Sequence, residues 1–243
     1  MLKLKIVRDY AELSNSAAEL LAQIIRRKPD AVVGLATGST PVGMYQRLVQ
    51  LHREQGLDFS RVTTFNLDEY AGLAPDHPQS YHSFMYSYLF KHINIARKNI
   101  HIPRGDTFDF QRESERYELA ISAAGGIDIQ VLGIGSNGHI GFNEPGSDFA
   151  GRTGLVTLKQ STIEDNARFF SSPQEVPRQA ISMGIQTIMS QAKQILLLAS
   201  GENKADAIRR MIKGEVTPEL PASILQRHRC VTVIADHAAA SYL

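Results

Sequence analysis

Residues 133–146 read GIGSNGHIGFNEPG and place an imidazole, a carboxylate and an amide on one short loop. His139 and Glu144 could form an acid–base pair, because a carboxylate sets the tautomer of a neighbouring imidazole and raises its proton affinity. Asn137 can orient such groups by hydrogen bonds, but an amide cannot serve as a base. The loop therefore predicts proton transfer on a bound ligand, and the alternative is a loop histidine in a structural hydrogen bond.

The same loop matches a dinucleotide-binding fingerprint, with glycines at positions 133, 135 and 138. That fingerprint needs a helix beginning at its third glycine and an acidic residue about 20 residues further on. Gly141 and Pro145 follow too closely for a helix, and the acidic residue in range, Glu164, comes late. We therefore expect no nicotinamide cofactor, and glycines that let the backbone approach a bound ligand closely.

A pair of carboxylates, Asp68 and Glu69, follows residues 64–67, the end of a predicted strand. A carboxylate at the end of a strand can act as a general base on a bound ligand, and the alternative is an acidic turn in water. In an open α/β sheet, ligands bind outside the carboxyl ends of the strands. That position makes Asp68 a candidate base.

Gly38, Ser39 and Thr40 lie between another apolar run and a helix, in which we expect Thr40 as N-cap and Pro41 as first residue. The free backbone N–H groups and the dipole of a helix N-terminus attract anions, and the hydroxyl groups add donors. The segment predicts a phosphate site, with plain helix capping as the alternative.

Two basic residues could complete that phosphate site. Lys204 falls in the first turn of a helix, where a cation opposes the helix dipole unless it shares an anion with the helix end. Arg168 could close over the same anion with a bidentate contact. Taken alone, Lys204 could equally be a solvated lysine, and Arg168 would be better explained as a surface arginine.

A metal site is the main competing interpretation, since His139 and Glu144 are also candidate ligands. No HxH, HExxH or CxxC spacing occurs, and we expect His77 and His82 to be exposed in a polar loop. A serine nucleophile is also disfavoured, because the sequence has no GxSxG elbow. We expect neither a metal nor another cofactor.

The elements that must position these residues alternate between strands and helices. This alternation predicts an α/β fold, with a doubly wound, largely parallel sheet and helices on both faces, as in Rossmann-like proteins. We expect one domain over residues 1–243, with a mobile lid within 147–180. Strands are expected at residues 3–7, 31–36, 62–67, 127–132, 195–199 and 231–235, and helices at 10–28, 41–54, 80–92, 113–124 and 205–213.

The composition is that of an ordinary globular protein, with 43% hydrophobic and 21% charged residues among 243. The net charge of +1 gives no field that would favour nucleic acid or an anionic membrane. Cys230 is the single cysteine, which excludes an intrachain disulfide, and we expect it to be buried. No membrane span or signal peptide is visible, so we expect a cytoplasmic protein.

Five blocks resemble the glucosamine-6-phosphate deaminase family in order and spacing: LATGSTPVGMY, TTFNLDEYAGL, LGIGSNGHIGFNEPG, NARFF and SGENKADAI. The resemblance implies conversion of glucosamine 6-phosphate and water into fructose 6-phosphate and ammonia, without a redox cofactor. It implies that Asp68 carries the proton from C2 to C1. His139 would move a proton in ring opening, with Glu144 as its partner. Phosphate contacts are implied for Gly38, Ser39, Thr40, Arg168 and Lys204.

The chain departs from the family pattern in two places. Some members have aspartate where this chain has Asn137, so the resemblance leaves the ring-opening relay to His139 and Glu144. The allosteric hexameric members bind N-acetylglucosamine 6-phosphate through basic residues aligned with Gly154 and Val156, and Asp148 replaces a small hydroxyl residue. The loss of these cations predicts no activation by that sugar phosphate, and a monomer.

Two other functions compete with this prediction. The related 6-phosphogluconolactonases share the glycine-rich turn, but a later block of theirs resembles GxDGH followed by a leucine-phenylalanine-proline run rather than GFNEPG. Asp68 and Glu144 also argue against lactone hydrolysis, which needs no base at C2. A sugar-phosphate sensor of a transcription regulator would need a DNA-binding module, and this chain has neither spare length nor a basic patch for one.

Overall fold

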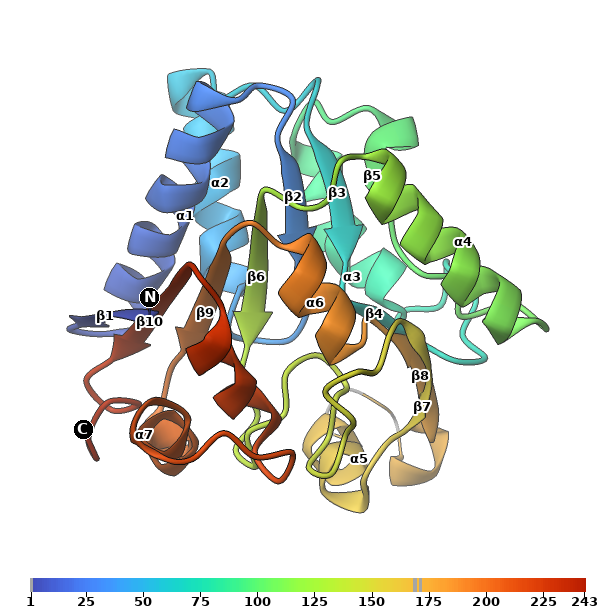
Figure 1. Cartoon of the computed structure of the whole chain (residues 1–243). Helices are drawn as coiled ribbons and strands as arrows, with labels where there is room; N and C mark the ends of the chain where they lie inside the picture. The colour runs from blue at the N-terminus through green and yellow to red at the C-terminus, as the bar shows by residue number, and fades with distance from the viewer. Residues whose placement is uncertain (1, 168–169, 171) are drawn as a thin grey trace.

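The computed structural model describes residues 2–167, 170 and 172–243. Within these residues, seven parallel strands form the central sheet, with β1 and β5 at its edges (Figure 1). Their order across the sheet is β1 (Leu2–Val7), β10 (Val231–Asp236), β9 (Ile195–Ala199), β6 (Ile129–Gly133), β2 (Val32–Leu35), β3 (Thr63–Asn66) and β5 (Ile100–His101). The predicted parallel sheet is confirmed.

Helices cover both faces of this sheet, as predicted for a doubly wound fold (Figure 1). The helices are α1 (Tyr10–Arg27), α2 (Val42–Gln55), α3 (Tyr81–Tyr88), α4 (Phe110–Ala123), α5 (Gln160–Ala167), α6 (Ile185–Gln191) and α7 (Ala205–Lys213). Short 3₁₀ turns lie at Phe90–His92, Arg97–Asn99, Pro173–Glu175, Glu202–Lys204 and Pro221–Arg227.

A second, antiparallel sheet in the described part of the chain joins β4 (Asp68–Tyr70) to β8 (Gln179–Ser182) and β7 (Gly154–Thr157). The segment 147–180, in which a mobile lid is predicted, contains β7, α5 and the start of β8. Strands of three or four residues are too short to show a clear sequence period, and the pairing of β8 with β4 and β7 forms this sheet.

Burial explains why the strands read as continuous apolar runs. Every residue of β9 is buried, as expected for a central strand covered on both faces, whereas edge strand β1 is mostly exposed. Helix α1 begins as predicted, with the Asp9 side chain accepting from the backbone N–H of Glu12.

Two local predictions are wrong. Pro41, not Thr40, is the N-cap of α2, and no side chain caps that helix. The hydroxyl of Thr40 is therefore not used by the helix itself. Cys230 is partly exposed rather than buried, because it precedes β10 instead of lying within it. Among the described helices, none is long and apolar enough to cross a membrane.

Candidate active site

The carboxyl ends of four neighbouring strands, β9, β6, β2 and β3, carry the residues singled out in the sequence. They surround a cavity of about 230 Å³. The predicted site residues that line it are Gly38, Ser39, Thr40, Asp68, His139 and Lys204. Asn137 and Glu144 lie behind His139 rather than on the cavity wall. Arg168 lies outside the described residues.

The turn after β2 is shaped by Gly38 and held by a tyrosine from α1. Gly38 has a φ of 89°, which a residue with a side chain rarely adopts. The Tyr10 hydroxyl donates to the Ser39 carbonyl at 3.1 Å and accepts from the Gly43 N–H at 2.8 Å. This bridge fixes the turn next to the start of α2, where N–H groups without a capping side chain can meet an anion.

The turn after β9 is held by a carboxylate from the neighbouring strand. Asp236, at the end of β10, accepts from the Ser200 hydroxyl at 2.5 Å and from the Gly201 N–H at 3.1 Å. The following 3₁₀ turn, Glu202–Lys204, brings Asn203 and Lys204 to the cavity. A cation and a helix N-terminus therefore face the cavity from two different strand ends.

Asp68 begins β4 and is 5% exposed, yet it lines the cavity. Burial and the neighbouring charge of Glu69 raise the pKa of its carboxyl to about 8. A base with a pKa near the working pH combines a useful ionised fraction with a strong affinity for the proton that it removes. The solvated acidic turn is thus excluded for Asp68.

His139 belongs to a buried polar network that the sequence did not resolve. The Oδ1 atom of Asn137 accepts from the His139 backbone N–H at 3.1 Å and from the ring Nδ1 at 2.8 Å. The Nδ2 atom of Asn137 donates to Glu144 Oε2 at 3.0 Å. Glu144 Oε1 accepts from the hydroxyl of Thr162 on α5.

This network gives Asn137 a definite function as a bridge. A backbone N–H can only donate, so the atom of Asn137 that faces His139 must be the oxygen, and Nδ1 must carry a proton. In the neutral ring, Nε2 then holds the lone pair. Glu144 Oε2 lies 3.6 Å from His139 Nδ1, which is within ion-pair distance but longer than a hydrogen bond, and Asn137 supplies the hydrogen-bonded link between the two residues.

The three fingerprint glycines serve different purposes. A Cβ on Gly135 would lie 2.3 Å from the His139 ring, and a Cβ on Gly138 would lie 2.2 Å from Leu220. Gly133 has open space at that position and lines the cavity. The expectation of clearance for a ligand fits Gly133, whereas the other two glycines admit neighbouring side chains. No helix forms in the fully described stretch 134–153, as expected.

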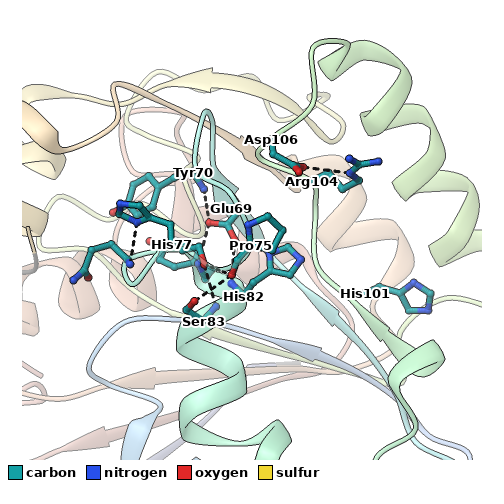
Figure 2. Close-up of polar contacts among 12 residues, drawn as sticks. Glu69, Tyr70, Pro75, His77, His82, Ser83, His101, Arg104 and Asp106 are labelled. Atoms are coloured by element: carbon teal, nitrogen blue, oxygen red, sulfur yellow. Dashed lines mark hydrogen bonds and ion pairs between the residues drawn. The ribbon is translucent and has the colours of Figure 1, made fainter.

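Glu69 is buried and points away from water, contrary to an acidic surface turn (Figure 2). Its carboxylate accepts from the backbone N–H groups of Tyr70 and Tyr81 at 2.9 Å, and of His82 at 3.0 Å. His82 Nδ1 donates to it at 2.8 Å. The prediction that His82 is exposed in a loop is therefore wrong, because His82 lies in α3 against Glu69, and His77 is also partly buried.

Several residues that line the cavity were missed as site candidates: Thr37, Tyr81, Phe142, Thr162, Asn166 and Asn203. The rings of Tyr81 and Phe142 stack at 6.1 Å with an angle of 10°, and they come from distant segments. Asn166 and Asn203 lie within the family-like blocks, which was the available signal. No cluster of three or more metal-ligating side chains exists in the described residues.

The chain was compared with known proteins. A family model described as glucosamine-6-phosphate isomerases/6-phosphogluconolactonase matches residues 8–234. Glucosamine-6-phosphate deaminase 2 of Bacillus subtilis (strain 168) is 58% identical over 243 residues, which cover 100% of this chain and 98% of that relative.

Solved structures share the same single-domain α/β fold. A structure described as a monomeric glucosamine-6-phosphate deaminase of the NagB superfamily matches with a TM-score of 0.97 and 49% identity, over 99% of this chain and 100% of that one. The 6-phosphogluconolactonase of Thermotoga maritima matches with a TM-score of 0.76 and 20% identity, over 97% and 99% of the two chains, which is a similarity of fold alone.

Proposed function

The chain belongs to the family of glucosamine-6-phosphate isomerases and 6-phosphogluconolactonases, and on that premise we propose that it is a glucosamine-6-phosphate deaminase. The observation that carries the proposal is one cavity lined by a carboxylate of raised pKa, an imidazole, a helix N-terminus and a lysine. Those groups suit a phosphorylated sugar that must lose and regain a proton. The reaction consumes water and breaks a C–N bond, so the enzyme acts as an isomerising hydrolase.

Binding begins at the phosphate. The start of α2, with Gly38, Ser39 and Thr40, and the Lys204 ammonium hold the phosphate from two strand ends. We assign Arg168 to the same anion on the family resemblance alone. His139, through Nε2, moves the proton between the ring oxygen and the C1 hydroxyl as the sugar opens to the aldehyde. Asn137 and Glu144 keep Nδ1 protonated, which leaves Nε2 as the working atom.

The isomerisation then uses Asp68. Its carboxylate takes the proton from C2, forming an enolamine, and returns a proton to C1, which becomes the alcohol carbon. The C2 imine that results adds water and expels ammonia, leaving the ketone of fructose 6-phosphate. Carbon 1 is reduced and carbon 2 is oxidised, so the step balances without an external oxidant or reductant.

We further propose that residues 147–180 contain a lid, that the protein is a monomer, and that it is located in the cytoplasm. The position of α5 is the evidence for a lid, because its Thr162 donates a hydrogen bond to Glu144 and its Asn166 lines the cavity. The monomer is supported by the solved relative described as monomeric. The cytoplasm is supported by a single cysteine and by metabolic relatives.

One assay tests the main proposal: ammonia release from glucosamine 6-phosphate, compared with hydrolysis of 6-phosphogluconolactone by the same preparation. We expect ammonia release and no lactone hydrolysis above background. Lactone hydrolysis without ammonia would make the chain a lactonase. A rise in melting temperature with the sugar phosphate, without ammonia, would make it a binding protein.

A further inference from the structure

Glu69 is the most completely bonded carboxylate next to the active site, and the mechanism above does not use it. Its side chain is 1% exposed, and its two oxygens accept four hydrogen bonds within 3.0 Å (Figure 2). Three donors are backbone N–H groups and the fourth is His82 Nδ1. Removing a carboxylate from water is costly unless each oxygen is satisfied, so this arrangement indicates a charged Glu69 held in one position.

The bonds of Glu69 join two elements that both reach the cavity. Glu69 belongs to β4, directly after Asp68, and its partners Tyr81 and His82 form the first turn of α3. Ser80 accepts from the Ser83 N–H, so Glu69 and Ser80 together satisfy the first three N–H groups of that helix. Tyr81 lines the cavity, and its hydroxyl interacts with Thr37 and Tyr70.

We propose that Glu69 is a positioning residue for the reaction: its buried carboxylate holds Tyr81 and the start of α3 against the strand that carries Asp68, and sets a fixed negative charge beside that base. His82 partly offsets that charge through its Nδ1–H. This inference rests on the proposed function for its catalytic consequence, and on the contacts of Glu69 for its physical basis.

The charge of Glu69 matters because most of the other titratable groups that face Asp68 are neutral tyrosines. The charge of Glu69 raises the pKa of Asp68 in addition to burial. The titratable groups that face Asp68 from the surrounding elements are Glu69 and Tyr70 on β4, Tyr81 on α3, Tyr45 on α2, Tyr117 on α4, and His139 and Lys204 across the cavity. Burial raises the pKa of the tyrosines above their usual value, so they stay neutral at working pH.

The test uses two variants with opposite expected signs. Glu69→Gln keeps the shape and removes the charge, so the acidic limb of the kcat/KM profile for ammonia release moves down by about one pH unit. We expect kcat to fall about tenfold and KM to change less than about threefold, because the phosphate contacts lie on other elements. His82→Leu removes one donor from Glu69, so the limb moves up. Glu69→Asp keeps the charge and leaves the limb at the wild-type position while kcat falls.

Glu118→Gln is the matched control. Glu118 is also buried and accepts from the Thr153 N–H and the hydroxyls of Thr153 and Thr187, but it does not line the cavity. We expect lower stability and an unmoved limb. An unmoved limb in both Glu69→Gln and His82→Leu would overturn the proposal, as would an equal shift in Glu118→Gln. Should Glu69→Gln fail to fold, His82→Leu decides, since His82 is 28% exposed at its side chain.

A titration separates this inference from the proposed function. The ¹³C carboxyl resonance of Asp68, assigned by its loss in Asp68→Asn, reports the proton on that group without substrate. A wild-type protein that releases no ammonia would end the proposed function. The inference about Glu69 would then be tested separately: it requires that the titration midpoint of the Asp68 carboxyl be lower in Glu69→Gln than in the wild type.

Discussion

In the proposed mechanism Asp68 is the base, and the buried environment that would strengthen it as a base also makes its charge unfavourable. Its pKa near 8 results from burial beside Glu69. A base must be deprotonated to remove the C2 proton, so the acidic limb of kcat/KM for ammonia release should lie near pH 8 rather than near 4. Asp68→Asn should retain substrate binding and lose about 10²–10⁴ in kcat. Near-normal turnover would contradict the assignment.

Gly135 lines the cavity and should be intolerant of a methyl group. A Cβ there would lie 2.3 Å from His139 Nδ1 and Cε1, so the ring must move. Because a misplacement of about 1 Å can cost about 10²-fold, Gly135→Ala should lower kcat by about that factor. Gly154→Ala is the control, since its Cβ would meet its nearest atom at 3.7 Å. Equal kinetics for the two variants would refute this account of Gly135.

At the scale of elements, the turn after β9 depends on a carboxylate from another strand. Asp236 binds Ser200 and the Gly201 N–H, and the backbone of Gly201 has a φ of 94°. Asp236→Ala should let the Glu202–Lys204 turn move. We expect KM for glucosamine 6-phosphate to rise about tenfold, with a smaller change in kcat, because a phosphate contact acts in both ground and transition states.

Asp128 provides the control for that variant at the opposite end of the sheet. It is paired with Lys28 at 2.6 Å and Lys193 at 2.9 Å, and it accepts from the Val32 N–H. Asp128→Ala should lower the urea midpoint without raising KM. A KM increase of the same size in Asp128→Ala would show that loss of stability alone explains the Asp236 result.

At the scale of the whole molecule, the pH dependence of stability should carry the signature of Asp68. Its pKa in the folded state is above the unfolded value of 3.8, so the folded state holds a proton that the unfolded state releases. The resulting stability is complete below pH 3.8 and is lost as pH rises through about 8. Glu118 and Asp128 have lowered pKa values and act oppositely, losing stability as pH falls.

The free energy of unfolding in urea, measured at about pH 5 and pH 9, tests this linkage. Asp68→Asn should gain about 4 kcal/mol relative to the wild type between the two pH values, since the wild type titrates over about three pKa units in this range and one unit is worth about 1.4 kcal/mol. A constant difference between the two proteins would show that the pKa of Asp68 is not raised.

Assembly and regulation also belong to the whole molecule. Gly154 and Val156 are the two partly exposed residues of β7, and neither carries a cation. We expect a single-chain mass by light scattering, and hyperbolic kinetics that N-acetylglucosamine 6-phosphate leaves unchanged. Sigmoidal kinetics abolished by that sugar phosphate would contradict this prediction.

The sequence by itself determined the alternation of strands and helices and the residue types at each strand end. A buried strand such as β9 and a capped helix such as α1 can be predicted from the sequence, because the apolar run and the capping residue are close together along the chain. The blocks around Asp68, His139 and Lys204 likewise indicated a sugar-phosphate site.

Only the tertiary structure decided how those residues cooperate. Neither the bridge from His139 through Asn137 to Glu144 and Thr162, nor the burial of Glu69 under α3, follows from spacing along the chain. The short strands β4, β7 and β8 form because they pair with one another. Hydrogen bonds between distant segments depend on the path of the chain in space, and a local pattern carries no record of that path.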